Sequence, residues 1–257
     1  MKLDTERFII KIAETSDELH AAQRLRYKVF VEEMGANVAD DCHFAQLEYD
    51  NFDQDFDHLI LIDKLKKNST ENVIGVYRLL LNTSVHKSRG FYTGSEYDLD
   101  CLIRTESKLL ELGRSCIDIE HRGGVALHMM WNGLAQYVID NNVELLFGVA
   151  SFHGTDTNQI SHALSFLHYN YLAPLKLRPI AIGKNKIDMD ILDRPDVEKI
   201  TALKQLPPLI KAYIRLGGYV GHGASIDADF NSIDVCLIMD TKNMSEKYKK
   251  LYSQGVN

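Results

Sequence analysis

The chain has 257 residues and a mass of 29.2 kDa, and 45% of its residues are hydrophobic, 25% charged and 9% aromatic. This composition is ordinary for a folded globular protein and excludes a disordered or fibrous chain. The formal net charge of -7 argues against a nucleic-acid-binding protein, because such domains present a basic face.

The first two thirds of the chain contain predicted strands and helices in mixed order. Residues 8–14 predict a strand and residues 16–33 predict an amphipathic helix. Thr15 and Glu18 have the spacing of a capping box at the start of this helix, and Gly35 ends it. The β-rich runs 58–63 and 73–81 flank a polar stretch and predict a hairpin. A strand over 109–119, a helix over 126–138, a strand over 143–152 and a helix over 157–171 follow. This order predicts an α/β fold with a central mixed sheet and helices on both of its faces.

The pattern changes beyond Pro174. A strand is expected over 177–182, a helical stretch over 196–216 that Pro207-Pro208 interrupts, and a last strand over 233–239. We expect one domain over residues 1–240, with a core at 7–182, an integral extension at 183–240 and a polar tail at 241–257. No run resembles a signal peptide or a membrane span, so a cytoplasmic location is expected. The four scattered cysteines predict free thiols rather than disulfides or a zinc site.

An acidic segment stands out at residues 35–63, which contain no Lys or Arg. Its carboxylates at 40–57 are Asp40, Asp41, Glu48, Asp50, Asp53, Asp55 and Asp57. Uncompensated carboxylates repel one another and require solvent, a cation or a cationic substrate. For Asp40, Asp41, Asp55 and Asp57 we favour a solvated loop. The aromatic residues between these carboxylates indicate that the segment packs against the rest of the protein, which is compatible with a role in amine binding.

Other charged residues lie inside otherwise apolar strands, namely Arg78, Glu111 and Arg114. Burying a charge at such a position costs folding free energy unless the charge is paired or faces water. Glu111 and Arg114 would point to opposite faces of a regular strand, and a bulge near Gly113 would change that. A structural ion pair and a functional role are about equally compatible with this spacing. No Ser-His-Asp or Cys-His arrangement stands out, so a covalent acyl-enzyme is not indicated.

A glycine-rich turn, residues 121–126, separates a predicted strand from a predicted helix. Backbone N–H groups at a helix start favour a phosphate, although such a turn is often only a turn.

Several stretches resemble the bacterial ornithine N-acyltransferases: Arg26–Phe30, Glu48–Asp53, Gly75–Leu80, Glu111–Cys116, Leu206–Gly217 and Phe230–Val235. The resemblance covers roughly residues 7 to 240 and implies a fold of the GNAT N-acetyltransferase type, related to the acyl-homoserine-lactone synthases. It further implies transfer of a 3-hydroxyacyl group from acyl carrier protein to the α-amine of L-ornithine. The product would be lyso-ornithine lipid, the first intermediate of ornithine lipid biosynthesis. The donor would be the 4'-phosphopantetheine thioester, with no metal and no further cofactor.

The resemblance also implies roles for individual residues. Glu111, Arg114 and Arg78 would be catalytic, with Glu111 accepting the amine proton directly or through water. The acceptor would be bound by Arg26, Phe30, Glu48, Asp50, Asp53 and Ser151. Arg122, Gly124 and Ala126 would hold the pantetheine phosphate. The loop departs from the usual GNAT pattern at His121, which suits a carrier-protein donor better than coenzyme A. A local basic patch is expected for the acidic carrier protein, with the candidates Arg104, Lys108, Arg122, Lys176 and Arg178.

Three alternatives remain open. The same machinery could serve acyl-homoserine-lactone synthesis or the N-acylation of another amino acid. The chain could also be a non-catalytic protein that binds acyl carrier protein, or an acetyltransferase that uses coenzyme A. A transient contact with the membrane, through which a lipid product would leave, is likewise left open.

Overall fold

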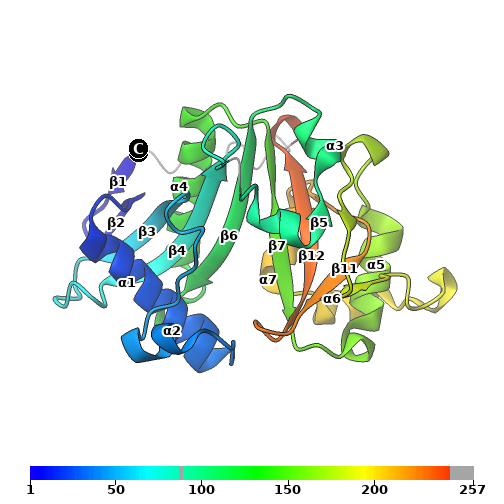
Figure 1. Cartoon of the computed structure of the whole chain (residues 1–257), viewed down its shortest axis with the longest axis horizontal. Coiled ribbons are helices and arrows are strands. Elements are labelled where there is room, and N and C mark those ends of the chain that lie inside the picture. The colour runs from blue at the N-terminus through cyan, green and yellow to red at the C-terminus, as the bar shows by residue number, and fades with distance from the viewer. Residues whose placement is uncertain (87–88, 244–257) are drawn as a thin grey trace. The chain divides into compact units, whose positions relative to one another are not determined.

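The computed structural model describes residues 1–86 and 89–243 (Figure 1). These form two compact units, one of Met1–His86 with Leu112–Asn142 and one of the described parts of 87–111 and 143–248. Strand β6 (Leu109–Ile117) begins in the second unit and ends in the first. Apart from the 3-10 turn η7 (Thr241–Asn243), the expected tail at 241–257 lies outside the described residues. One domain over 1–240 stays a prediction.

The first unit contains the strands β1 (Lys2–Asp4), β2 (Phe8–Ile12), β3 (Asp57–Asp63), β4 (Val73–Leu81) and the end of β6, in this spatial order. Strands β3 and β4 pair antiparallel, with Leu59 opposite Tyr77, which confirms the predicted hairpin. Helix α1 (Ser16–Arg26) begins at Thr15, whose hydroxyl accepts the N–H of Glu18 at 3.2 Å, as the capping box predicts. It continues as a π-helix, η1 (Tyr27–Glu33), and Gly35 follows its end with a φ of +75°.

The two long helices of the first unit cover opposite faces of its strands. Helix α1 packs against a cluster that includes Ile60 and Val76. Helix α4 (Val125–Asp140) lies against Ile10 and Leu59 through Gly133, where a Cβ would be 2.4 Å from Ile10 Cδ1. Because neighbouring residues of a strand point to opposite faces, Ile60 and Leu59 place the helices on different sides (Figure 1).

The second unit is built on the start of β6, β7 (Leu145–His153), β12 (Ser232–Asp240), β11 (Ala224–Asp227) and β9 (Lys186–Ile187), in this spatial order. Strands β6 and β7 are parallel, with Leu109 opposite Leu145, whereas β7 and β12 are antiparallel. Strand β10 (Tyr219–Val220) pairs with β12, and β5 (Tyr97–Asp98) pairs with β8 (Ile180–Ala181). The pairing confirms the predicted mixed sheet and α/β class.

The remaining helices are α2 (Asp40–Ala45), α3 (Asp100–Ile103), α5 (Ser161–Tyr171), α6 (Lys199–Gln205) and α7 (Pro208–Arg215). Pro207-Pro208 separates α6 from α7 as expected. The predicted strand over 177–182 is wrong in extent, because only Ile180–Ala181 is a strand and Leu175–Leu177 is a 3-10 turn, η5. Pro179, which lacks a donor N–H, lies inside the predicted strand and directly precedes the observed one. Among the residues that the structure describes, no helix is both long and apolar enough to cross a bilayer.

Candidate active site

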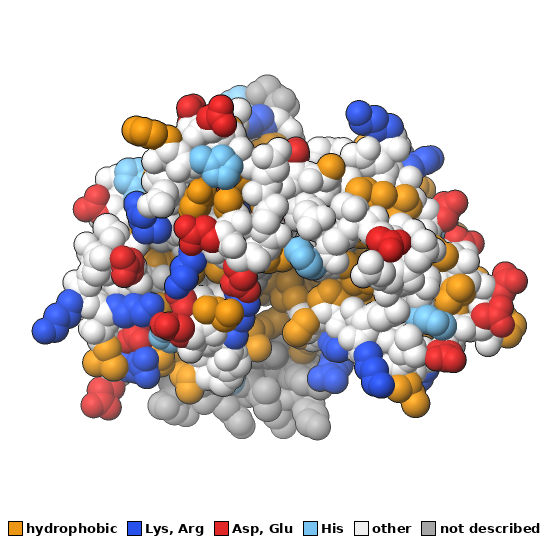
Figure 2. All heavy atoms as spheres, turned by 90° about the horizontal axis from the view of Figure 1, so that it is seen from below, with side chains coloured by type: hydrophobic (Ala, Val, Ile, Leu, Met, Phe, Trp, Pro, Cys, Tyr) orange, Lys and Arg blue, Asp and Glu red, His pale blue; other side chains and the backbone are white. Residues whose placement is uncertain are grey.

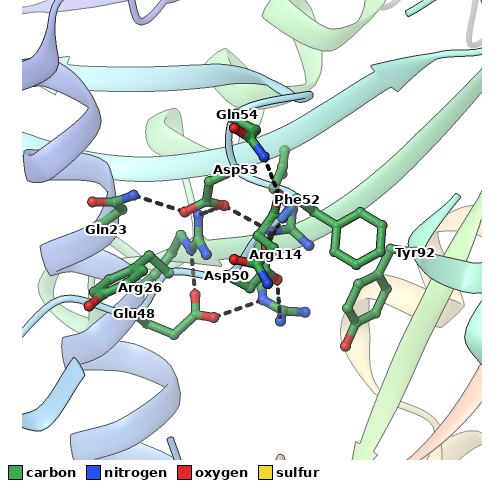
Figure 3. Close-up of polar contacts among 12 residues, drawn as sticks. Gln23, Arg26, Glu48, Asp50, Phe52, Asp53, Gln54, Tyr92 and Arg114 are labelled. Atoms are coloured by element: carbon green, nitrogen blue, oxygen red, sulfur yellow. Dashed lines mark hydrogen bonds and ion pairs between the residues drawn. The ribbon is translucent and has the colours of Figure 1, made fainter. Parts of the chain in front are cut away.

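A buried ion network in the first unit unites six of the residues that the sequence singles out (Figure 3). Helix α1 supplies Arg26, the segment between α2 and β3 supplies Glu48, Asp50 and Asp53, β4 supplies Arg78 and β6 supplies Arg114. Such a network requires tertiary folding, because its members come from four separate parts of the chain.

Two arginines form the floor of this network, the part without access to solvent. The side chain of Arg26 is 0% exposed, and it donates from Nε to Glu48 at 2.5 Å and from Nη1 to Asp53 at 2.8 Å. Arg78 is also fully buried and donates from Nη1 to Asp50 at 2.7 Å and to Asp53 at 2.8 Å. Charges this deep persist only when opposite charges and hydrogen bonds surround them.

Arg114 and Asp50 form the rim of the network. Asp50 has the most exposed side chain of the three carboxylates, at 24%, and Arg114 is 10% exposed. The contacts of Arg114 with Glu48 and Asp50 are both 3.2 Å, longer than those of the two buried arginines. Arg114 also has a φ of +50°, a left-handed conformation that interrupts the regular alternation of β6 close to the predicted bulge. The rim is therefore the part of the network that a small polar molecule can reach.

The expectation of uncompensated carboxylates is wrong for Glu48, Asp50 and Asp53. Within the described residues, the network sets three arginines against these three carboxylates, so its formal charge is balanced. Burial acts to raise the pKa of Glu48, but Arg26 and Arg114 outweigh it and lower that pKa to about 2. Burial is likewise overcome at Asp53, where Arg26 and Arg78 hold the pKa well below its usual range.

Two buried polar residues that the sequence reasoning missed brace the network. Gln23 lies three positions before Arg26 on the inner face of α1 and donates from Nε2 to Asp53 at 2.8 Å. His58 Nε2 lies 3.0 Å from the backbone oxygen of Asp53, and burial lowers the pKa of its imidazole. The three-residue spacing of Gln23 and Arg26 on one helix is the signal that could have found the first. Phe56 adds a cation–π contact, with its ring centre 4.5 Å from the Arg78 guanidinium carbon.

Glu111 lies in the second unit and is 1% exposed. Its two carboxylate oxygens accept the backbone N–H groups of Tyr92, at 3.0 Å, and Thr93, at 2.6 Å. The carboxylate thereby fixes the start of the 3-10 turn η2 (Tyr92–Ser95). Ser151, also in this unit, is exposed on β7 opposite Asp234 of β12. Phe30 lies in the π-helix of the first unit and packs, half-buried, against the core cluster under α1.

A pocket of about 390 Å³ opens at the start of α4 in the first unit. Its lining includes Arg7, His121, Arg122, Gly123 and Ala126. Gly124 precedes the helix with a φ of +68°, no side chain among the described residues caps the first turn, and no acidic residue lies in that turn. Unpaired N–H groups and the helix dipole therefore favour an anion here.

Both arginines of this pocket already have carboxylate partners. Arg7 donates from Nη2 to Asp63 at 2.7 Å, and this hydrogen bond, against the effect of burial, lowers the pKa of Asp63 to about 2. Arg122 pairs with Glu33. The pocket thus offers backbone amides and neutralised cations, which suits an anion of low charge.

A cysteine nucleophile is not supported by the geometry. All four cysteines are free, as expected. Cys116 is 6% exposed, and burial raises the pKa of its thiol to about 12, so it stays protonated at neutral pH.

Comparison with known proteins places these features in a family. A family model described as an acetyltransferase (GNAT) domain matches residues 25–132. The chain is 46% identical over 248 residues to the L-ornithine N(alpha)-acyltransferase of Rhodobacter capsulatus, covering 96% of this chain and 95% of the relative. It is 36% identical to the protein of the same name from Brucella abortus, covering 96% of this chain and 89% of that one.

A solved structure of the CoA-dependent acyl-homoserine lactone synthase BjaI shares the fold, with a TM-score of 0.51 and 12% identity over 93% of this chain and 82% of that one. The GNAT match and the long, closely similar relatives agree with the resemblance found in the sequence. The chain belongs to the L-ornithine N(alpha)-acyltransferase family, and it is an acyltransferase with a GNAT fold.

Proposed function

We propose that this acyltransferase moves a 3-hydroxyacyl group from acyl carrier protein to the α-amine of L-ornithine, producing lyso-ornithine lipid. The observation that supports it most is the charge-balanced network with Arg114 and Asp50 at its rim. A free amino acid carries both a carboxylate and ammonium groups. A rim with one cation and one anion, above a neutral floor, complements such a zwitterion better than a site of a single sign.

In this proposal Arg114 holds the acceptor carboxylate and Asp50 holds an ammonium group. The guanidinium of Arg114 can exchange its two 3.2 Å contacts for a bidentate pair with a substrate carboxylate. Asp50 keeps its shorter bond with Arg78, at 2.7 Å, and so remains in place while it does this. A side-chain ammonium held by Asp50 stays protonated and therefore non-nucleophilic, which leaves the α-amine to react.

The reaction is aminolysis of a thioester. The neutral α-amine attacks the thioester carbonyl, the new C–N bond forms as the C–S bond breaks, the phosphopantetheine sulfur leaves as a thiolate and the amine loses a proton. Glu111 is our proposed final acceptor of that proton. Because its carboxylate is 1% exposed and binds two backbone N–H groups, we propose that a water molecule carries the proton to it.

The pocket at the start of α4 is the proposed site for the phosphate of the donor. A carrier-bound pantetheine presents one phosphodiester, whereas coenzyme A adds a pyrophosphate and a further phosphate. A pocket whose arginines are already paired fits the smaller charge. This is the support for a carrier-protein donor.

The test is acyl transfer by the purified chain from 3-hydroxyacyl-carrier protein, with mass spectrometry of the product. L-Ornithine, glycine and S-adenosylmethionine are offered as competing acceptors, and acetyl-CoA as a competing donor. We expect lyso-ornithine lipid as the main product. A lactone, an acylglycine or an acetylated product as the main species would contradict the proposal, and no product at all would favour a non-catalytic protein.

A matched pair of variants locates the acceptor site. Asp50→Asn should lower kcat/KM for ornithine by about 10- to 100-fold, because it removes a charged hydrogen bond worth roughly 1.5 to 3 kcal/mol. Asp41→Asn removes the same charge from an exposed position in helix α2 and should leave kcat/KM within about twofold. Equal effects of the two substitutions would contradict an acceptor site at the rim.

A further inference from the structure

The segment from residue 174 to residue 186 exposes several large aliphatic side chains of the second unit. Leu175 is 80% exposed, Ile180 50% and Ile182 40%. Ile103, 54% exposed, ends helix α3, which packs against the turn η5 that carries Leu175 (Figure 1 labels α3). Aliphatic side chains gathered on one surface mark a site of contact with a protein or a membrane.

The backbone that presents these side chains is firmly tied down. The N–H of Ala181 donates to His222 O at 2.8 Å, and the N–H of Ile182 donates to Glu96 O at 2.8 Å. Strand β8 pairs with β5, and β9 pairs with β11. The exposure of the aliphatic side chains therefore belongs to a fixed surface, not to a loosely held loop.

The same segment is basic. Residues 172–187 contain three lysines, one arginine and no Asp or Glu, although the whole chain has a net charge of -7. Two exposed carboxylates, Asp188 and Asp190, follow this stretch. Lys176, Lys184 and Lys186 are exposed. Of the carboxylates on the neighbouring β5 and α3, Asp98 is exposed beside Ile180, and Asp100 pairs with Arg104 at 2.6 Å. On the face drawn in Figure 2, acidic and basic side chains are interspersed.

We propose that this surface docks on an anionic lipid bilayer. It comprises Leu175, Lys176, Ile180, Ile182, Lys184 and Lys186, and we call it the 174–186 surface. Aliphatic side chains enter the boundary between headgroups and acyl chains, while lysines reach the headgroup phosphates on flexible stems. Stable binding to a membrane surface needs such a pair of signals, apolar and basic.

A bilayer fits this surface better than an acidic protein partner. Its most exposed cations are lysines, which act as point charges on mobile stems and suit a diffuse layer of phosphates. A protein carboxylate is more often met by the fixed fork of an arginine. The inference rests on the proposed function only for the reason why the protein would bind a membrane: an acylated amino acid with a long chain must pass from water into a membrane.

The experiment is flotation of the full chain with vesicles of phosphatidylcholine, with and without about one-third phosphatidylglycerol. We expect binding to the anionic vesicles that weakens as salt rises from about 0.1 M to about 1 M. Lys176→Glu with Lys184→Glu, and separately Leu175→Ser with Ile182→Ser, should each weaken binding about tenfold or more.

Matched controls come from helix α6 of the same unit. Lys199→Glu with Lys204→Glu makes the same change in net charge at exposed lysines, and Ile200→Ser removes a side chain that is 73% exposed. Both controls should bind within about twofold of the unchanged chain. Circular dichroism confirms that all variants are folded.

Three results would overturn the proposal. The first is that the unchanged chain does not bind anionic vesicles. The second is that the α6 controls lose as much vesicle binding as the variants of the 174–186 surface. The third is that the Lys176 and Lys184 variant binds vesicles as before but has a raised KM for the carrier-protein thioester. The last would assign the surface to a protein partner. Acyl transfer assayed without vesicles tests the proposed function separately, so vesicle binding localised to the 174–186 surface supports the inference whatever that assay shows.

Discussion

Replacement of Asp53 by Asn should destabilise the fold, because this carboxylate neutralises two arginines that have no access to solvent. Asp53 accepts hydrogen bonds from Gln23, Arg26 and Arg78, each at 2.8 Å. The substitution leaves three guanidinium groups facing two carboxylates. Removal of one partner of a buried ion pair costs about 3 to 5 kcal/mol, and we expect the free energy of unfolding to fall by that amount.

The neighbouring carboxylate provides the internal control. Asp50 is 24% exposed and lies at the rim, so water can compensate when its charge is removed. Asp50→Asn should therefore cost only about 1 kcal/mol of stability while it impairs acceptor binding. The two substitutions have the same chemistry, but Asp53 is buried and pairs with both fully buried arginines, whereas Asp50 is partly exposed and pairs with Arg78 and Arg114.

Urea unfolding at pH 7, followed by far-UV circular dichroism, measures both values. The urea dependence of the unfolding free energy should stay constant across the variants, which shows that the midpoints report stability. If Asp53→Asn destabilises the protein no more than Asp50→Asn does, the buried charges do not depend on Asp53 and the reasoning fails.

Three further predictions concern other parts of the first unit and Glu111. The pKa of Glu48 is about 2 in the folded state against an ordinary 4.5, and this difference corresponds to about 3 kcal/mol of folding stability. The stability is present above pH 4.5 and is lost as the pH falls toward 2. Urea midpoints that do not change between pH 6 and about 3 would contradict this. Thr15→Ala removes the cap of α1 and should cost about 1 kcal/mol in the same assay, whereas full stability would mean that the 3.2 Å contact contributes nothing. Glu111→Gln should lower kcat by roughly 10²- to 10⁴-fold. A kcat within about twofold of that of the unchanged chain would leave Glu111 only its role in holding the turn at Tyr92.

Local features of the fold could be predicted from sequence because they depend on neighbouring residues. The capping box at Thr15, the hairpin of β3 and β4 and the break at Pro207-Pro208 each follow from contacts within a few positions. Helix α2 was missed because its six residues offer too little periodicity to distinguish it from a loop. The strand predicted over 177–182 is too long because its aliphatic residues favour a strand, whereas Pro179 within it cannot donate to a neighbouring strand.

The charge balance of the site could not be predicted in the same way. The acidic segment looked uncompensated because its partners, Arg26, Arg78 and Arg114, are separated from it by up to 66 positions. Sequence spacing contains no information about which distant side chains become neighbours. The resemblance to a family did identify the six residues, but only the folded structure shows that they neutralise one another.

This neutralisation explains how a polar acceptor site can be built into a folded core. Arg26 and Arg78 are fully buried, and their ion pairs make the charges of Glu48 and Asp53 tolerable inside the unit. That leaves Arg114 and Asp50 as a rigid pair of opposite charges whose orientation is fixed from below. A charge that the floor did not balance would draw counter-ions or water to the rim, and an incoming amino acid would have to displace them. In the proposed acceptor site, the buried arginines would therefore assist binding by fixing the orientation of Arg114 and Asp50.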